Sequence, residues 1–122
     1  MSDAPQAPVT ALLAEHCRGM RFETLPGEVI FSARQCLLDW LGVTLAGASE
    51  PLSRMLREDA LADGGSPQAT LIGSGERVTA KQAALVNGPA SHALDYDDVV
   101  LAMSGHPSVP VWPALLALAE WR

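Results

Sequence analysis

Acidic and histidine side chains gather in the second half of this 122-residue sequence. His92, Asp95, Asp97, Asp98 and His106 fall within fifteen positions, between apolar segments that read as helices. Carboxylates at this density repel one another unless a cation, a shared proton or bulk water relieves the charge. The segment is therefore either a solvated connection or a site whose ionisation is tuned for chemistry.

The chemistry indicated by these residue types is proton transfer. If a helix continues through the segment, His92, Asp95 and Asp98 share one face at i, i+3 spacing, with Asp97 rotated away. A histidine beside aspartates suits proton exchange near neutral pH. His106 falls in a Gly-His-Pro-Ser turn before the last predicted helix, whose N-terminus disfavours a charged imidazole and attracts carboxylates. There it could accept a proton from a carbon acid.

Metal binding is a third interpretation of the same residues. His92, Asp95, Asp98 and His106 all carry ligand atoms, but their spacing matches no HExxH, EF-hand or Cys/His zinc pattern. We therefore expect no metal at this segment.

Composition limits the classes of function. The sequence is 48% hydrophobic but only 5% aromatic, which favours an Ala/Leu/Val-rich helical interior, and its net charge is −6. No Lys/Arg cluster could neutralise phosphates, so a nucleic-acid partner is not expected. Cys17 and Cys36 lack CxxC spacing and fall in helical patterns, which favours buried free thiols. We find neither a signal peptide nor an apolar run of about 18 residues, and so expect a cytoplasmic protein without membrane attachment.

The predicted architecture is mainly α, a bundle-like set of helices with one short β-hairpin. Residues 1–8 form a frayed tail; helices are predicted over about 9–18, 24–48, 51–62, 79–88 and 107–122, and a hairpin pairs 69–72 with 76–78. Thr24 is the predicted N-cap of the second helix. Thr79 and Gln82 form a capping box, and Gly88-Pro89 interrupts the helix that the box opens.

The second predicted helix is apolar on almost every side over residues 37–48. Such a helix is normally covered by other elements. This much buried helix is hard to accommodate in 122 residues. The last helix is also still apolar where the sequence stops. Both features lead us to expect a larger assembly or a longer protein.

Three segments carry a resemblance to a known family. They are residues 33–47, residues 69–73, and residues 84–88 running into His-Ala-Leu-Asp-Tyr-Asp-Asp at 92–98 and His-Pro-Ser at 106–108. In order and spacing they resemble the N-terminal part of the MmgE/PrpD family, over about residues 8–120. The resemblance implies that residues 9–122 are the first part of a larger all-α domain. A smaller α/β lid and a dimeric assembly are implied as well.

The resemblance also implies an activity. The family includes 2-methylcitrate dehydratase, cis-aconitate decarboxylase and an iminodisuccinate epimerase, which move a proton at a carbon next to a carboxylate without metal or organic cofactor. It implies His106 and Asp95 as catalytic residues, and Asp98 and His92 as substrate contacts. His92 is further expected to be structural, bonded to nearby backbone. Lys81, the single lysine, is the expected cation for a substrate carboxylate.

One departure from the family pattern is Val99-Val100, where many members have a polar pair. The polycarboxylate substrate needs cations, and Lys81 with seven arginines, mostly on solvated helix faces, offers few. We expect the rest from the remaining polypeptide or a partner chain, so the 122-residue chain alone should lack turnover. A 2-methylcitrate dehydratase-like lyase is the leading hypothesis. An epimerase of the same family, or a truncated non-catalytic remnant that serves in assembly, stays open.

Overall fold

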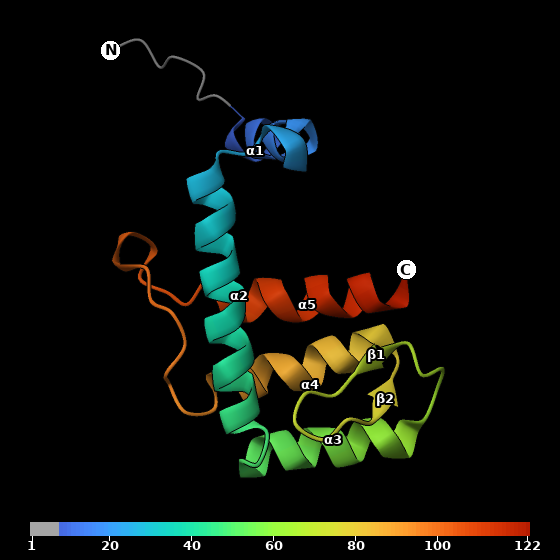
Figure 1. The fold of residues 1–122 in the computed structure, drawn as a ribbon. Coiled ribbons are helices and arrows are strands. Elements are labelled where there is room, and N and C mark those ends of the chain that lie inside the picture. Colours follow the sequence, from blue (N-terminus) through green and yellow to red (C-terminus); the bar gives the residue numbers. More distant parts are fainter. Residues whose placement is uncertain (1–7) are drawn as a thin grey trace, which may run out of the picture. The chain divides into compact units, whose positions relative to one another are not determined.

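The computed structural model describes residues 8–122, which form two units, one up to Ser32 and one from Ala33 to Arg122. The first unit contains α1 (Val9–Gly19), the 3₁₀-helix η1 (Phe22–Thr24) and the start of α2 (Gly27–Gly47). The second contains the rest of α2, then α3 (Pro51–Asp63), β1 (Ala69–Thr70), β2 (Arg77–Val78), α4 (Ala80–His92), η2 (Leu101–Met103) and α5 (Ser108–Trp121) (Figure 1). The mainly α class with one hairpin is confirmed. Apart from Pro8, the predicted tail lies outside the described residues.

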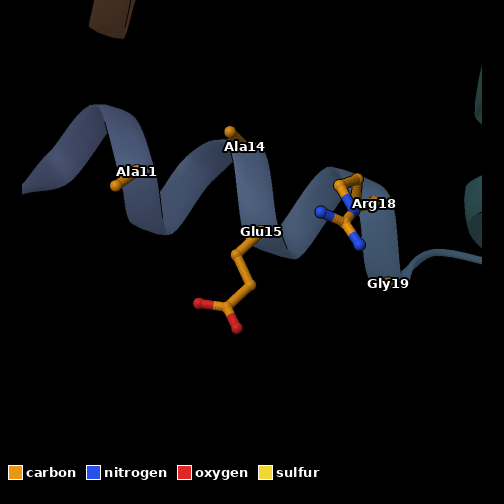
Figure 2. Close-up of a pocket in the computed structure, with 5 residues that line it drawn as sticks. All are labelled: Ala11, Ala14, Glu15, Arg18 and Gly19. Carbon is orange, nitrogen blue, oxygen red and sulfur yellow. The ribbon is translucent and has the colours of Figure 1, made fainter.

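The first unit has no buried residue in α1. A hollow along this helix is lined by Ala11, Ala14, Glu15, Arg18 and Gly19, all from α1 itself (Figure 2). It is open helix surface rather than an enclosed site. Cys17 is exposed here, which corrects the prediction of a buried thiol, while Cys36 in α2 is half-buried; both are free.

The predicted N-cap at Thr24 is wrong. Thr24 ends η1, and its hydroxyl donates to the Arg21 carbonyl at 2.9 Å. Leu25 is extended, with φ −71° and ψ 135°. A residue before proline is pushed out of the α region, so Pro26 delays the start of α2 to Gly27.

Helix α2 buries only Trp40, Thr44 and Gly47. Among the described residues little covers the rest, and Leu38 and Leu45 are exposed, so the cover expected from a larger assembly or a longer protein stays a prediction. By length and composition α2 could cross a membrane, which corrects our finding of no such run. Length and composition alone are weak evidence, because core helices meet the same criteria.

The end of α2 is fixed by a close backbone approach. A β-carbon on Gly47 would overlap the Ala90 carbonyl of α4, so only glycine fits there. The Gly47 carbonyl also accepts a hydrogen bond from the Ser53 hydroxyl of α3 at 2.7 Å. The C-terminal end of α2 is thereby joined to both α3 and α4.

Helix α4 lies between α3 and α5, and the hairpin packs against α4 and α5 (Figure 1). The buried core between these elements is built from small and medium side chains: Ala60, Ala69, Leu71, Val78, Ala83, Val86 and Ala117. Alanines at such contacts let helices approach closely, which agrees with the alanine-rich composition.

Helix α4 begins as predicted and ends later than predicted. The Thr79 hydroxyl accepts from the Gln82 amide at 3.3 Å, and the Gln82 side chain accepts from the Thr79 amide at 3.0 Å, which confirms the capping box. The predicted interruption at Gly88-Pro89 is wrong, because α4 continues to His92. Pro89 removes one N–H from the helix, but the buried residues Ala90 and Ser91 keep the last turn packed.

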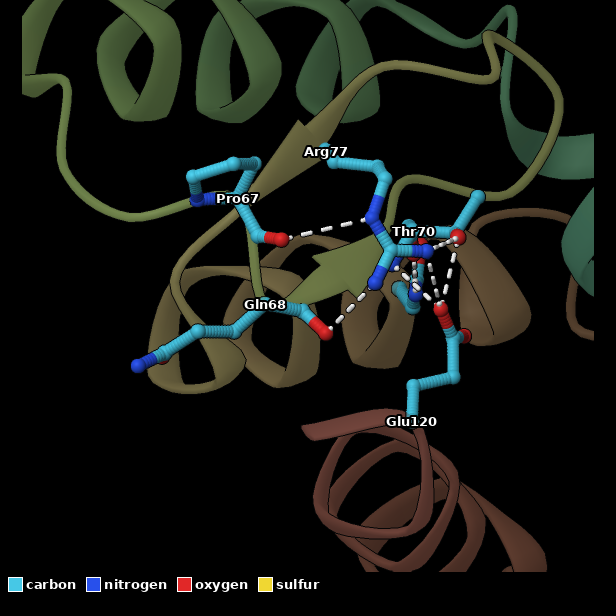
Figure 3. A network of polar contacts seen from close by, with 6 residues as sticks. Pro67, Gln68, Thr70, Arg77 and Glu120 are labelled. Atoms are coloured by element: carbon cyan, nitrogen blue, oxygen red, sulfur yellow. Dashed lines mark hydrogen bonds and ion pairs between the residues drawn. The ribbon is translucent and has the colours of Figure 1, made fainter. Parts of the chain in front are cut away.

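The hairpin is shorter than predicted, with Ala69 opposite Val78 and Thr70 opposite Arg77. Two-residue strands are marginal alone. Here Glu120 of α5 secures them: its Oε2 accepts from the Thr70 amide at 3.0 Å, the Thr70 hydroxyl at 2.7 Å and Arg77 Nη1 at 3.1 Å (Figure 3). We call Thr70, Arg77 and Glu120 the hairpin cluster.

Candidate active site

The acidic segment is a loop and not a helix. Helix α4 ends at His92, and Asp95 has a left-handed backbone with φ 54°. The predicted helical face that joins Asp95 and Asp98 to His92 and turns Asp97 away is therefore wrong. Asp97 is instead the buried carboxylate of the three.

Asp97 lies between the two histidines. Its side chain is 0% exposed; Oδ1 lies 2.8 Å from His92 Nδ1, and Oδ2 lies 2.9 Å from His106 Nδ1. The contact with His92 is a hydrogen bond. The contact with His106 is short but not aligned for a hydrogen bond, and these two atoms are buried without another partner. We call Asp97, His92 and His106 the Asp97 cluster.

The opposite nitrogen of His106 points toward Asp95. His106 Nε2 lies 3.8 Å from Asp95 Oδ1, which is longer than a hydrogen bond. The His106 side chain is 28% exposed and that of Asp95 is 82% exposed. The ring centroids of His92 and His106 are 4.7 Å apart in an edge-to-face arrangement. The structure thus places His106 near Asp95, the two residues that the family resemblance implies as catalytic, and leaves Nε2 without a hydrogen bond.

Asp98 holds the start of α5. Its Oδ1 accepts from the Ser108 amide at 3.2 Å and its Oδ2 from the Ser108 hydroxyl at 2.8 Å. Pro107, the residue before the helix, gives no side-chain cap, so Asp98 satisfies the first amide of α5 instead. Both oxygens of Asp98 are therefore engaged by the scaffold, which accounts for the serine of His-Pro-Ser.

Lys81 is not brought to this site. It lies in the first turn of α4, eleven residues before His92 (92 − 81), or about 16 Å along the helix axis. There it borders an apolar hollow with Leu118 and Trp121 of α5. The backbone bond expected for the His92 ring is also absent from the described residues, because its Nδ1 bonds the Asp97 carboxylate.

An apolar pocket of about 440 Å³ lies beside the Asp97 cluster, between α3, α4 and α5. His92 is its only titratable lining residue; the others are Leu52, Ala84, Leu85, Gly88, Pro89, Ala93 and Val109. The half-exposed His92 ring therefore borders both the buried carboxylate and this pocket.

Four side chains of the site could hold a metal ion. His92, Asp95, Asp97 and His106 each offer one atom, and these atoms lie within 4.8 Å of one another. Tetrahedral zinc, with bonds of about 2.0–2.1 Å, holds its ligand atoms about 3.4 Å apart. The present arrangement is wider at Asp95, and Asp97 Oδ1 is already bonded to His92, so metal binding needs the side chains to move.

The loop between Asp98 and His106 is closed by a backbone bridge. The Val100 amide donates to the Gly105 carbonyl at 3.0 Å, and η2 forms the tip between them. Val99, Leu101 and Met103 are exposed on this loop. Within residues 8–122 no lysine or arginine forms an ion pair with Asp95, Asp97 or Asp98.

The MmgE/PrpD N-terminal domain family matches residues 11–122, so the chain belongs to the MmgE/PrpD family, and the assignment made from sequence is confirmed. The chain is 30% identical over 113 residues to the cis-aconitate decarboxylases of Homo sapiens and Mus musculus, an overlap of 92% of this chain and 23% of each relative. It is 30% identical over 118 residues to the cis-aconitate decarboxylase-like protein oryM of Aspergillus oryzae, covering 95% of this chain and 24% of that protein. The chain thus spans about a quarter of the length of these curated relatives.

Proposed function

We propose that this chain supplies acid/base residues to a cofactor-independent lyase that acts on a small di- or tricarboxylate, with His106 as the principal proton-transfer residue. The observation that carries the proposal is the position of the His106 ring. Nδ1 is held against buried Asp97, while Nε2 faces the exposed Asp95 without a hydrogen bond. An imidazole supported on one side and free on the other is suited to proton transfer.

The reaction class follows from the chemistry of the proposed substrate. In an elimination, His106 Nε2 takes a proton from the carbon next to a carboxylate, the electron pair forms a double bond, and hydroxide leaves as water after it gains a proton. In a decarboxylation, the C–C bond to a carboxylate breaks, CO₂ leaves, and the carbon receives a proton. The names of the relatives favour decarboxylation of cis-aconitate over dehydration of 2-methylcitrate.

The acidic surroundings of His106 support a site that is completed by residues from elsewhere in the protein. Asp95, Asp97 and Asp98 are all acidic, and substrate carboxylates need positive partners. We propose that these come from further parts of the polypeptide or from a second copy of the chain. A homodimer, which the family resemblance implies, and a cytoplasmic location, which we expected from the sequence, remain part of this proposal.

The test compares the purified 122-residue chain with the product of the longest reading frame that contains it. Both are incubated with cis-aconitate, 2-methylcitrate and an epimerisable dicarboxylate, and CO₂ release, dehydration and proton exchange are measured. We expect CO₂ release from cis-aconitate by the longer product alone. Turnover by the 122-residue chain, or no activity of the longer product on any of the three substrates, contradicts the proposal.

A second candidate function is a non-catalytic role in assembly. The exposed apolar residues of α2, with Val99 and Val100 in place of a polar pair, favour it. An inactive longer product that forms a stable oligomer would support this alternative.

A further inference from the structure

Asp97, which the sequence pattern predicted to turn away from the other site residues, lies between His92 and His106. We propose that Asp97 is a positioning residue that holds His92 and His106 with their protons on Nδ1, so that both rings offer Nε2 for proton transfer. The catalytic part of this inference rests on the proposed function. The protonation pattern itself does not, and it can be measured separately.

The carboxylate of Asp97 is fully buried. Its side chain is 0% exposed, and an ionised carboxylate can only accept hydrogen bonds. A buried charge needs partners. Within residues 8–122, the side chains that meet its two oxygens are the imidazoles of His92 and His106, at 2.8 and 2.9 Å. An unprotonated Nδ1 at these distances would set its lone pair against a carboxylate oxygen, so both Nδ1 atoms carry the proton.

The nitrogens on the far side of the two rings, Nε2 of His92 and of His106, then become proton acceptors. A neutral imidazole carries one proton, so a ring protonated at Nδ1 has an accepting Nε2. His92 thereby becomes a second acid/base group and not only a structural residue. Its side chain is 47% exposed and borders the apolar pocket. An elimination requires a base for the carbon-bound proton and an acid for the leaving hydroxide, and a decarboxylation requires an acid for the carbon that loses CO₂. A neutral ring can take the carbon-bound proton at Nε2, and a ring that holds a second proton there, as imidazolium, can give it to the leaving hydroxide or to the carbon that loses CO₂.

The loop around Asp97 is anchored at both of its ends. His92 is the last residue of α4, and Asp98 is bonded to Ser108 at the start of α5. The Val100–Gly105 bridge closes the loop before His106. The segment that carries Asp97 is therefore tied to the end of α4 on one side and to the start of α5 on the other. This keeps the carboxylate in place between the two imidazoles.

The contact with His106 is short but misaligned. Catalytic hydrogen bonds are often poorly aligned in a free enzyme and improve when substrate binds. A small rotation of the His106 ring would align its Nδ1–H with Asp97 Oδ2. We expect this alignment in the substrate complex.

The direct test is the protonation pattern of the three histidines, His16, His92 and His106, by long-range ¹H–¹⁵N NMR. At pH about 9, well above the usual histidine pKa of about 6.5, each neutral ring reports which nitrogen carries its proton. Free histidine favours the proton on Nε2, and His16, exposed on α1, serves as the internal reference. We expect the proton on Nδ1 in both His92 and His106. The proton on Nε2 in either ring overturns the proposal.

Asp97→Asn sharpens this test. An amide accepts on one side and donates on the other, so one of the two histidines should move its proton to Nε2. Asp95→Asn, which changes the exposed carboxylate on the other side of His106, should leave both protons on Nδ1. If Asp97→Asn does not fold, the wild-type spectrum alone still decides the question.

The catalytic part of the inference is tested by steady-state kinetics on the longer product. Asp97→Asn should lower kcat at least tenfold and change KM little, because the variant disturbs the proton-transfer groups and not the substrate's charged contacts. An unchanged kcat overturns the catalytic part. An inactive wild-type product with both protons on Nδ1 would instead contradict the proposed function and leave the role of Asp97 in holding the two rings standing.

Discussion

The antiparallel pair of helices α4 and α5 carries a polar cluster at each end, and the two clusters are built differently. At one end, the hairpin cluster balances the charge of Glu120 with that of Arg77, and Arg77 also donates to the carbonyls of Pro67 and Gln68 (Figure 3). At the other end, the partners of Asp97 among residues 8–122 are two imidazoles, and one of the two contacts is misaligned.

This difference agrees with a structural role for the hairpin cluster and with the proton-transfer role that we propose for the Asp97 cluster. Arginine keeps its charge at all ordinary pH values, so Arg77 can hold Glu120 and the hairpin on α5 but cannot exchange a proton. Histidine changes charge near neutral pH, and the free Nε2 of His106 is available for exchange. Changes in the first cluster should therefore affect stability, and changes in the second should affect turnover.

The largest expected effect is on turnover at the Asp97 cluster. His106→Gln in the longer product should lower kcat by about 10²–10⁴-fold, the usual contribution of a general acid or base. Glu120→Gln in the hairpin cluster should leave kcat close to the wild-type value. Steady-state kinetics measures both, and comparable activity of the His106 variant would remove the distinction between the clusters.

A large loss of stability is expected where α2 approaches the end of α4 that carries His92. Gly47→Ala should destabilise the second unit by about 3 kcal/mol, because its β-carbon overlaps the Ala90 carbonyl and backbone yields little. Gly42→Ala is the matched control: nothing lies within 4 Å of its β-carbon, so it should stabilise α2 by about 0.5–1 kcal/mol. Urea unfolding decides the point, and equal effects of the two substitutions would show that the approach at Gly47 is not rigid.

A smaller loss of stability is expected in the hairpin cluster. Glu120→Ala should cost about 1–3 kcal/mol, because the Thr70 amide loses its acceptor. The ion pair with half-exposed Arg77 contributes little of this cost. Glu120→Gln keeps an acceptor and should cost less in thermal unfolding. The reverse order would mean that charge, and not the acceptor, holds the hairpin.

The smallest expected effect lies at the start of α5. Asp98→Ala should lower the free energy of unfolding by about 1 kcal/mol, the usual value of a helix cap. Asp98→Asn retains an acceptor for the Ser108 amide and should lose less. If both variants are as stable as the wild type, Asp98 is free to bind substrate, as the sequence first suggested.

Much of the fold could be predicted from sequence because its signals are local. The capping box at Thr79 and Gln82, the hairpin at 69–78 and the late start of α5 depend on neighbouring residues. The wrong predictions at Thr24 and Pro89 also involve proline. At Thr24 the effect of proline on the helix was underestimated, and at Pro89 it was overestimated. Pro26 directs Leu25 out of the helix, whereas the buried turn beyond Pro89 packs well enough to remain helical.

The site could be predicted only in part. His106 and Asp95, the pair that the family resemblance implies as catalytic, lie 3.8 Å apart at their nearest nitrogen and oxygen. The roles of Asp97 and Asp98 could not be read from three aspartates in one short segment. Which of them is buried depends on the end of α4 at His92 and on the left-handed backbone at Asp95. One signal was present in the sequence: between Lys81 and Arg122 the only basic side chains are His92 and His106, so histidine was the local candidate to pair a buried aspartate.

The Val100–Gly105 bridge allows the tip of this loop to vary in sequence and length without moving its base. The bridge separates the loop into a closed base, which carries Asp97, Asp98 and His106, and a tip of four residues, 101–104. Insertions or deletions in the tip leave the bridge and the residues below it in place. The loop can therefore change length and surface character while Asp97, Asp98 and His106, which include the proposed proton-transfer groups, stay fixed.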